Sequence, residues 1–317
     1  MQATVLSRKL NVYGAITAKI VRAIKDAKGT YRMPWHTGEL PLQVPTNAVT
    51  DHPYRGVNIL SLWIDAMAKG YSSGTWASYK QWQTLGSQVR HGEHGSIIIF
   101  YRRLDQTAEE EEAGEAHRYV ARASWVFNAA QCDGWQPAPP PVRLSGVEID
   151  KTVAAFIEAT GAQIDHGYNM ARYRIDLDRI EMPSPSWFFD TKTRTAAQAY
   201  HGVLLHELTH WTGAAHRVGR DLRNRFGARA YAFEELVAEL GAAFMCAAFK
   251  IANEPRQDHA AYVASWLEVL NDDPKTIFTA ANRAQEAIEY LGNLAAEKLD
   301  RFEAAPAMAD AGQTSEQ

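Results

Sequence analysis

The sequence predicts an α+β protein in two parts: N-terminal helices with a small antiparallel sheet, then a mainly helical part with a short antiparallel sheet. In residues 11–28, apolar side chains recur every four positions, which is the period of an amphipathic helix. The short runs 96–101 and 119–127 are rich in β-branched and aromatic residues, which is typical of strands. Long apolar stretches with a helical period fill most of the second part.

The first part is expected to contain three helices, each followed by a glycine, the residue that commonly follows the last helical position. They cover residues 11–28, 57–69 and 75–85. A loop with four prolines separates the first two helices. The acidic run 109–112 is expected to lie in a solvated loop between the two strands.

The second part is expected to be mainly helical. A strand pair, residues 173–175 and 179–182, is expected across an Asp-Leu-Asp turn. Helices are expected near residues 149–160, 195–212, 231–251, 258–271 and 274–302.

The domain boundary is expected in the proline-rich stretch 134–146 (GWQPAPPPVRLSG), which reads as an extended linker. It separates a domain of residues 1–133 from a domain of residues 147–303. The tail 304–317 is small and polar and is expected to be disordered.

Composition favours a cytoplasmic protein without membrane contact. No apolar run approaches the roughly 20 residues that cross a bilayer. No signal peptide is readable at the N-terminus. The two cysteines, Cys132 and Cys246, belong to no metal or disulfide pattern and are expected to be reduced.

Charge is unevenly distributed along the chain, whose net charge is −4. Residues 1–104 carry 13 Lys and Arg against 5 Asp and Glu, whereas residues 141–317 carry 18 against 25. A basic first part followed by an acidic remainder indicates that the first part meets a polyanion.

Residues 206–210 form the pattern HExxH inside a predicted helix. Because residues four apart share a helix face, His206 and His210 can reach one metal ion. Glu207 lies beside them and is expected to act as general base on a metal-bound water, whose pKa zinc lowers to about 7. The sequence therefore predicts a Zn²⁺ site of the metallopeptidase type, with another divalent ion such as Mn²⁺ as the alternative.

Two regions of the sequence offer candidates for the third metal ligand. In the stretch 234–239, Glu235 and Glu239 share a helix face, so one can bind the metal while the other orients a ligating histidine. His216 competes, because residues 206–216 also fit HExxHxxGxxH, although Met245 is a poor fit for the Met-turn that this pattern requires. We favour Glu235 as the ligand and Glu239 as the residue that orients a ligating histidine, with Glu239 or Glu234 as further alternatives for the ligand.

Aromatic and basic residues alternate through the first part. Single strands of nucleic acid are gripped by stacking bases on aromatic rings in a groove whose cations follow the backbone. The candidate DNA-binding residues are Trp35, Arg55, Trp76, Tyr79, Lys80, Trp82 and Arg90.

Several longer stretches resemble the antirestriction protein family ArdC, which is related to the N-terminal part of TraC-type conjugative primases. The resemblance extends from about residue 12 to about residue 291. The stretches that carry it include residues 54–60 (YRGVNIL), 180–183 (IEMP), 206–213 (HELTHWTG) and 234–244 (EELVAELGAAF). Position 216 departs from the family, in which serine is common there.

The resemblance implies an N-terminal single-stranded-DNA-binding domain joined to a zincin-like metallopeptidase domain that protects incoming plasmid DNA from host restriction during conjugation. It implies metal ligation by His206, His210 and a glutamate of 234–239, with Glu207 as base. The resemblance further implies a protein substrate, with a component of the host restriction system as the candidate. The alternative is a DNA-binding protein whose metal-bound zincin domain is a scaffold without turnover.

Overall fold

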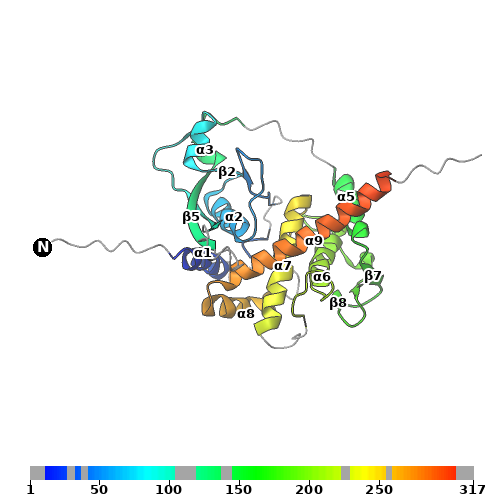
Figure 1. The fold of residues 1–317 in the computed structure, drawn as a ribbon. Helices are drawn as coiled ribbons and strands as arrows, with labels where there is room; N and C mark the ends of the chain where they lie inside the picture. The colour runs from blue at the N-terminus through cyan, green and yellow to red at the C-terminus, as the bar shows by residue number, and fades with distance from the viewer. Residues whose placement is uncertain are drawn as a thin grey trace, which may run out of the picture.

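The computed structural model is an α+β fold in which short sheets flank a central group of long helices (Figure 1). No helix of the described ranges has the length and apolar character needed to span a membrane. The expected acidic loop 109–112, part of the proline-rich stretch and residues 305–317 of the expected tail 304–317 lie outside these ranges, whereas residue 304 is helical. The structure describes residues 11–26, 33–36, 42–103, 119–136, 145–222, 229–254 and 259–304.

The N-terminal helices form where the apolar period predicts them. Helix α1 (Val12–Asp26) buries Val12, Ile16, Ile20 and Ile24 on one face. Helix α2 (Val57–Lys69) ends at Gly70, whose φ of 68° is the left-handed conformation that favours glycine.

The prediction of a single helix over residues 75–85 is wrong. Residues Thr75–Ala77 form strand β2, and only Tyr79–Thr84 form helix α3. Ser78 begins the helix by accepting a hydrogen bond from the backbone N–H of Gln81, while Gln81 binds back to the backbone of Ser78. Strand β2 pairs with residues 127–128, so a contact between residues far apart in the sequence makes residues 75–77 extended.

The first sheet has the strand order β1-β2-β5-β4, where β1 is Thr46–Asn47, β4 is Ser96–Arg103 and β5 is Tyr119–Asn128. The expected antiparallel pairing of β4 with β5 is confirmed, and β1 adds to β2 in parallel. Asn58 of α2 covers the outer edge of β4: its amide donates to Ile99 O and accepts from Ile99 N, both at 2.8 Å. A separate pair joins β3 (Gln88–Val89) to β6 (Cys132–Asp133).

The second part begins with helix α5 (Gly146–Thr160) and a three-stranded sheet. The expected antiparallel pair is present as β8 (Arg172–Arg174) and β9 (Arg179–Met182). Strand β7 (Gln163–His166) pairs in parallel with β9 and was not expected, because its residues lack an apolar alternation. The long helices are α6 (Ala196–Thr212), α7 (Arg229–Phe249), α8 (His259–Asp272) and α9 (Thr276–Ala304).

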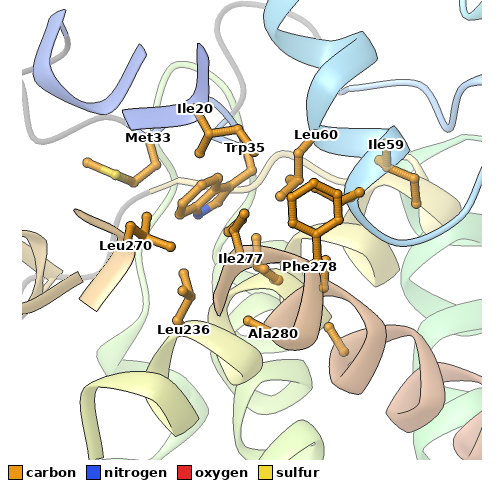
Figure 2. Close-up of a cluster of buried hydrophobic side chains, with 14 of the residues drawn as sticks. Ile20, Met33, Trp35, Ile59, Leu60, Leu236, Leu270, Ile277, Phe278 and Ala280 are labelled. Atoms are coloured by element: carbon orange, nitrogen blue, oxygen red, sulfur yellow. The ribbon is translucent and has the colours of Figure 1, made fainter. Parts of the chain in front are cut away.

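One apolar cluster joins the two parts of the chain. Figure 2 shows the ring of Trp35 among Ile20 and Met33 of the first part and Leu236 and Ile277 of the second. Trp35 is fully buried there and packs on Trp266 of α8, with ring centroids 6.3 Å apart. The division into domains 1–133 and 147–303 stays a prediction, and the packing between these parts is a continuous core.

Helix α7 carries a glycine, Gly241, where it packs against Thr209 of α6. A Cβ added at Gly241 would lie 2.5 Å from Oγ1 and 2.6 Å from Cγ2 of Thr209 on α6. Thr209 is itself held, because its hydroxyl donates to Leu205 O at 2.9 Å. The absence of a side chain at position 241 therefore sets the spacing between the two helices.

We expect Gly241→Ala to destabilise the protein by about 1–3 kcal/mol, because the added methyl overpacks a stiff β-branched neighbour. The matched control is Gly202→Ala in α6, where the added Cβ would meet no atom closer than 3.9 Å. That variant should be neutral or more stable by up to about 1 kcal/mol, since alanine favours helix. Denaturant unfolding of both variants measures the difference; equal stabilities would contradict the close contact.

Candidate metal centre

Helix α6 carries the HExxH residues, and the structure shows a cap at each of its ends. Thr195 accepts a hydrogen bond from the Gln198 N–H in a reciprocal capping box, and the helix stops at Gly213. His206 and His210 lie one turn apart and are buried, with their Nε2 atoms 3.2 Å apart. Glu207 is buried on the same helix between them.

Helix α7 brings Glu235 to these two histidines. Its Oε2 lies 3.6 Å from Nε2 of His206, and its Oε1 lies 3.5 Å from Nε2 of His210. Among the described residues, His206, His210 and Glu235 form a group whose ligand atoms all lie within 4.8 Å of one another.

These spacings fit one small ion. Ligand atoms about 2.0–2.1 Å from a tetrahedral ion are about 3.3 Å from each other. Two imidazole nitrogens and one carboxylate oxygen are the donor set of a zincin-type centre, which leaves the fourth position for water or substrate.

His210 is held through its Nδ1 by Glu234, which Arg220 binds in turn. Its Nδ1 lies 3.1 Å from Oε1 of Glu234, and Arg220 donates to the same glutamate through Nε and Nη2 at 3.0 and 2.9 Å. Burial lowers the pKa of His210, but its hydrogen bonds to Glu234 and Glu235 outweigh this and raise the pKa to about 9. Without a metal, a proton therefore occupies this ring at neutral pH, and an ion has to displace it.

Glu235 remains ionised despite its burial. Removal from water raises its pKa, but hydrogen bonds to His206 and His210 lower it well below the ordinary range. An anionic carboxylate is the form that binds a metal ion.

Glu239 lies on the far side of His206. Its Oε2 is 3.7 Å from Nδ1 of His206, and the carboxylate is buried. This position suits the supporting role expected for Glu239. His216, the competing ligand, lies elsewhere: its side chain is exposed and its Nε2 is 3.4 Å from Oδ2 of Asp178.

Three of the predicted DNA-binding aromatics are core residues. Trp35, Trp76 and Trp82 are at most 1% exposed. The indole N–H of Trp82 donates to Phe127 O at 3.0 Å, while Trp35 Nε1 lies 3.4 Å from Oε1 of Glu239. The expectation that these rings face a nucleic acid is therefore corrected, since no base can stack on a ring packed on both faces.

The other predicted DNA-binding residues lie at the surface. Tyr79 and Lys80 of α3 are exposed. Arg55 forms an ion pair with Glu289. Arg90 donates to Glu93 at 3.0 Å and to the backbone of Ala130 at 2.5 Å. Both arginines are thus already engaged within the protein.

Sequence reasoning missed three residues around these sites. Arg220 lies in an irregular segment without a motif, so only the fold brings it to Glu234. The role of Glu234 as partner of His210 was not predicted, although its position next to Glu235 in the sequence indicates that it lies near the metal site. Trp125 is 50% exposed on β5, two residues before Phe127, where strand alternation could have indicated a shared face.

Comparisons with known proteins match both parts of the chain. Residues 10–131 match the family of the N-terminal domain of anti-restriction factor ArdC, and residues 151–283 match the zincin-like metallopeptidase family. The metal-free crystal structure of antirestriction protein ArdC from plasmid R388 is 36% identical, with a TM-score of 0.74 over 90% of this chain and 98% of that chain. This chain belongs to the ArdC antirestriction family.

Other relatives extend the ArdC family resemblance. The Mn(II)-bound structure of the same R388 protein is 34% identical, with a TM-score of 0.71. The uncharacterized protein y4eC of Sinorhizobium fredii is 42% identical over 89% of this chain and 91% of that protein. Two DNA primases TraC from Escherichia coli are 31% and 33% identical over 87% of this chain, which spans only 19% and 26% of their lengths.

We expect Glu235→Ala to weaken divalent-metal binding by more than about a hundredfold, which exceeds the typical loss for a residue that only supports a ligand. His216→Ala is the matched control and should bind metal like the wild type. Metal titration with a competing chelator measures both, and thermal unfolding without metal checks folding. The reverse order of affinities would exclude Glu235 as the third ligand.

Proposed function

We propose that this ArdC-family protein binds single-stranded DNA through its N-terminal part and hydrolyses a peptide bond at a metal site in its C-terminal part. The observation that carries the peptidase proposal is the arrangement of His206, His210 and Glu235 at the mutual distances of a tetrahedral site, with Glu207 on the same helix turn.

The donor set determines what chemistry a bound ion supplies there. A divalent ion polarises a peptide carbonyl and lowers the pKa of water toward 7. Two imidazoles and a carboxylate suit Zn²⁺, and the R388 relative is described as Mn(II)-bound, so either ion is a candidate.

The chain's own residues have separate roles in this proposal. Glu207 accepts a proton from the attacking water at its carboxylate and returns it to the leaving nitrogen. Glu234 and Arg220 hold the His210 ring with Nε2 toward Glu235. A cavity of about 500 Å³ is lined by Arg220, Phe233 and Glu234, and so lies beside the partners of His210; none of the three ligands nor Glu207 lines it.

The DNA proposal moves from the buried tryptophans to an aromatic strip, which we define as the exposed Tyr79 and Trp125 and the partly buried Phe127. The rings of Tyr79 and Phe127 meet edge to face with centroids 6.2 Å apart. A Cβ at Gly95 would lie 3.0 Å from Cβ of Trp125 and 3.3 Å from the Phe127 ring, so both residues lie against the same glycine.

The aromatic strip has the properties of a stacking surface. Tyr79 is 43% and Trp125 50% exposed, and the exposed Lys80 follows Tyr79 directly. Exposed rings beside a cation suit unpaired bases and their phosphates, and each stacked base contributes about 1–3 kcal/mol. The basic balance of residues 1–104 favours the same partner.

Together these activities support protection of incoming plasmid DNA from restriction during conjugation, the function implied by the ArdC family. A protein of the host restriction system is the substrate class that would connect peptide hydrolysis with this protection. The burial of His206, at 1% exposure, favours a second candidate function, in which the metal only stabilises a DNA-binding protein.

Glu207→Gln separates the two functions. Loss of the general base should lower peptide hydrolysis by about 10²–10⁴-fold while metal content stays at the wild-type level. Plasmid transfer into restricting and non-restricting recipients measures protection, and His210→Ala, which loses a ligand, is the comparison. Full protection by Glu207→Gln would exclude the peptidase function and leave the scaffold.

For DNA, we expect the full-length protein to prefer single strands to duplex. Trp125→Ala and Tyr79→Ala should each lower affinity by about tenfold at every salt concentration, because each removes a stacking ring. Lys80→Ala should instead reduce the slope of log affinity against log salt by about 0.7. Fluorescence anisotropy with labelled oligonucleotides measures both effects.

Trp187→Ala is the matched control for DNA binding, since Trp187 is 59% exposed in the C-terminal part. Its DNA affinity should equal that of the wild type. Equal binding of duplex and single strands, or an equal loss in Trp187→Ala, would contradict the aromatic strip as the DNA-binding surface.

A further inference from the structure

A buried turn of the N-terminal part, residues 33–36, lies against α7 beside the metal centre. The backbone N–H of Met33 donates to Nδ1 of His36 at 2.9 Å, and the N–H of His36 donates to Met33 O at 2.9 Å. Asn253 anchors the same turn by donating to Trp35 O at 3.1 Å. Two segments more than 200 residues apart in sequence are therefore fixed to each other at this point.

The turn determines which nitrogen of His36 carries the proton. Because Nδ1 accepts a hydrogen bond from the Met33 backbone, the ring is neutral and its proton lies on Nε2. Nε2 then donates to Oε1 of Glu239 at 2.8 Å. The indole Nε1 of Trp35 lies 3.4 Å from the same oxygen.

The other oxygen of Glu239 faces a metal ligand. Oε2 lies 3.7 Å from Nδ1 of His206, whose Nε2 faces Glu235 at 3.6 Å. A ligating imidazole needs an acceptor at the nitrogen that does not bind the ion, because this acceptor fixes its tautomer and ring orientation. His36 holds one carboxylate oxygen of Glu239 while the other is directed to His206.

We propose that His36 is a positioning residue of the metal centre, which fixes Glu239 and through it orients His206. The proposal rests on the proposed metal-binding role of His206, His210 and Glu235. It makes the N-terminal part a component of a site whose ligands all come from the C-terminal part. By thermodynamic reciprocity, ion binding then also strengthens the contact between the two parts.

The test measures zinc affinity of the full chain, with zinc chloride titrated against a chromophoric chelator. His36→Phe keeps a planar ring but removes the donor, and should weaken zinc binding by about tenfold, the lower limit for partners of ligating histidines. His36→Gln places an amide N–H near the former Nε2 and should restore most of the affinity. His36→Asn, whose amide corresponds to Nδ1, should not.

The matched control is His201→Phe, which replaces another buried histidine on α6 that lies beside Asp150. Its zinc affinity should equal that of the wild type. The visible absorption of bound Co²⁺ provides a second measurement, because it reports ligand geometry. This spectrum should change in His36→Phe and return in His36→Gln, whereas loss of global stability alone would not alter it.

A double-mutant cycle tests the route through Glu239. In a Glu239→Gln background, His36→Phe should cause no further loss of zinc affinity, because both changes interrupt the same contact. If His36→Phe does not fold, the comparison of the other two variants decides, because His36→Gln should bind zinc more tightly than His36→Asn. Equal affinities of the wild type, His36→Gln and His36→Asn, or a wild-type Co²⁺ spectrum in a folded His36→Phe, would overturn the inference.

Failure of the metal site itself has a different signature. If the wild type binds no zinc, or if His210→Ala binds it equally well, the proposed ligand set is wrong before His36 is considered. If binding depends on His210 but is indifferent to every change at position 36, the ligand set stands and the positioning role is excluded.

Discussion

The burial of carboxylates beside imidazoles between α6 and α7 is the constraint on which this structure depends. Glu234, Glu235 and Glu239 lie on one apolar helix and are all less than 10% exposed. An ionised carboxylate taken out of water is costly unless it meets a cation or several hydrogen-bond donors. Arg220 and His210 satisfy Glu234, and the two HExxH histidines satisfy Glu235. The close approach of the helices at Gly241 makes these contacts possible.

The sequence was most informative where local rules decide the outcome. HExxH spacing predicted the shared helix face, and the stretch 234–239 pointed to a second helix with Glu235 toward the metal and Glu239 behind it. The helical period predicts both shared faces, but the choice of Glu235 over Glu239 as the ligand does not follow from it. The α+β class was likewise predictable, because the long helices have a strong apolar period and strands β4 and β5 are rich in β-branched and aromatic residues.

The sequence was least informative where distant residues decide the outcome. Trp76 and Trp82 were predicted to bind DNA because aromatic and basic residues alternate in the first part, yet short elements around β2 turn both rings inward. Strand β7 was missed because its parallel pairing with β9 satisfies its backbone without an apolar alternation. Arg220 and His36 belong to no pattern, since only tertiary packing gives them their partners.

The continuous core around Trp35 has a consequence for how the two parts of this chain can occur within other proteins. Removal of either part would expose large apolar surfaces of α1, α2, α7 and α9 to water, at a cost of about 25 cal/mol for each Å². The two parts are thus expected to unfold together, as one cooperative unit. A unit of this kind can be transferred to another protein only as a whole. The matches to TraC agree with this, because they cover 87% of this chain, across both parts, within a much longer protein.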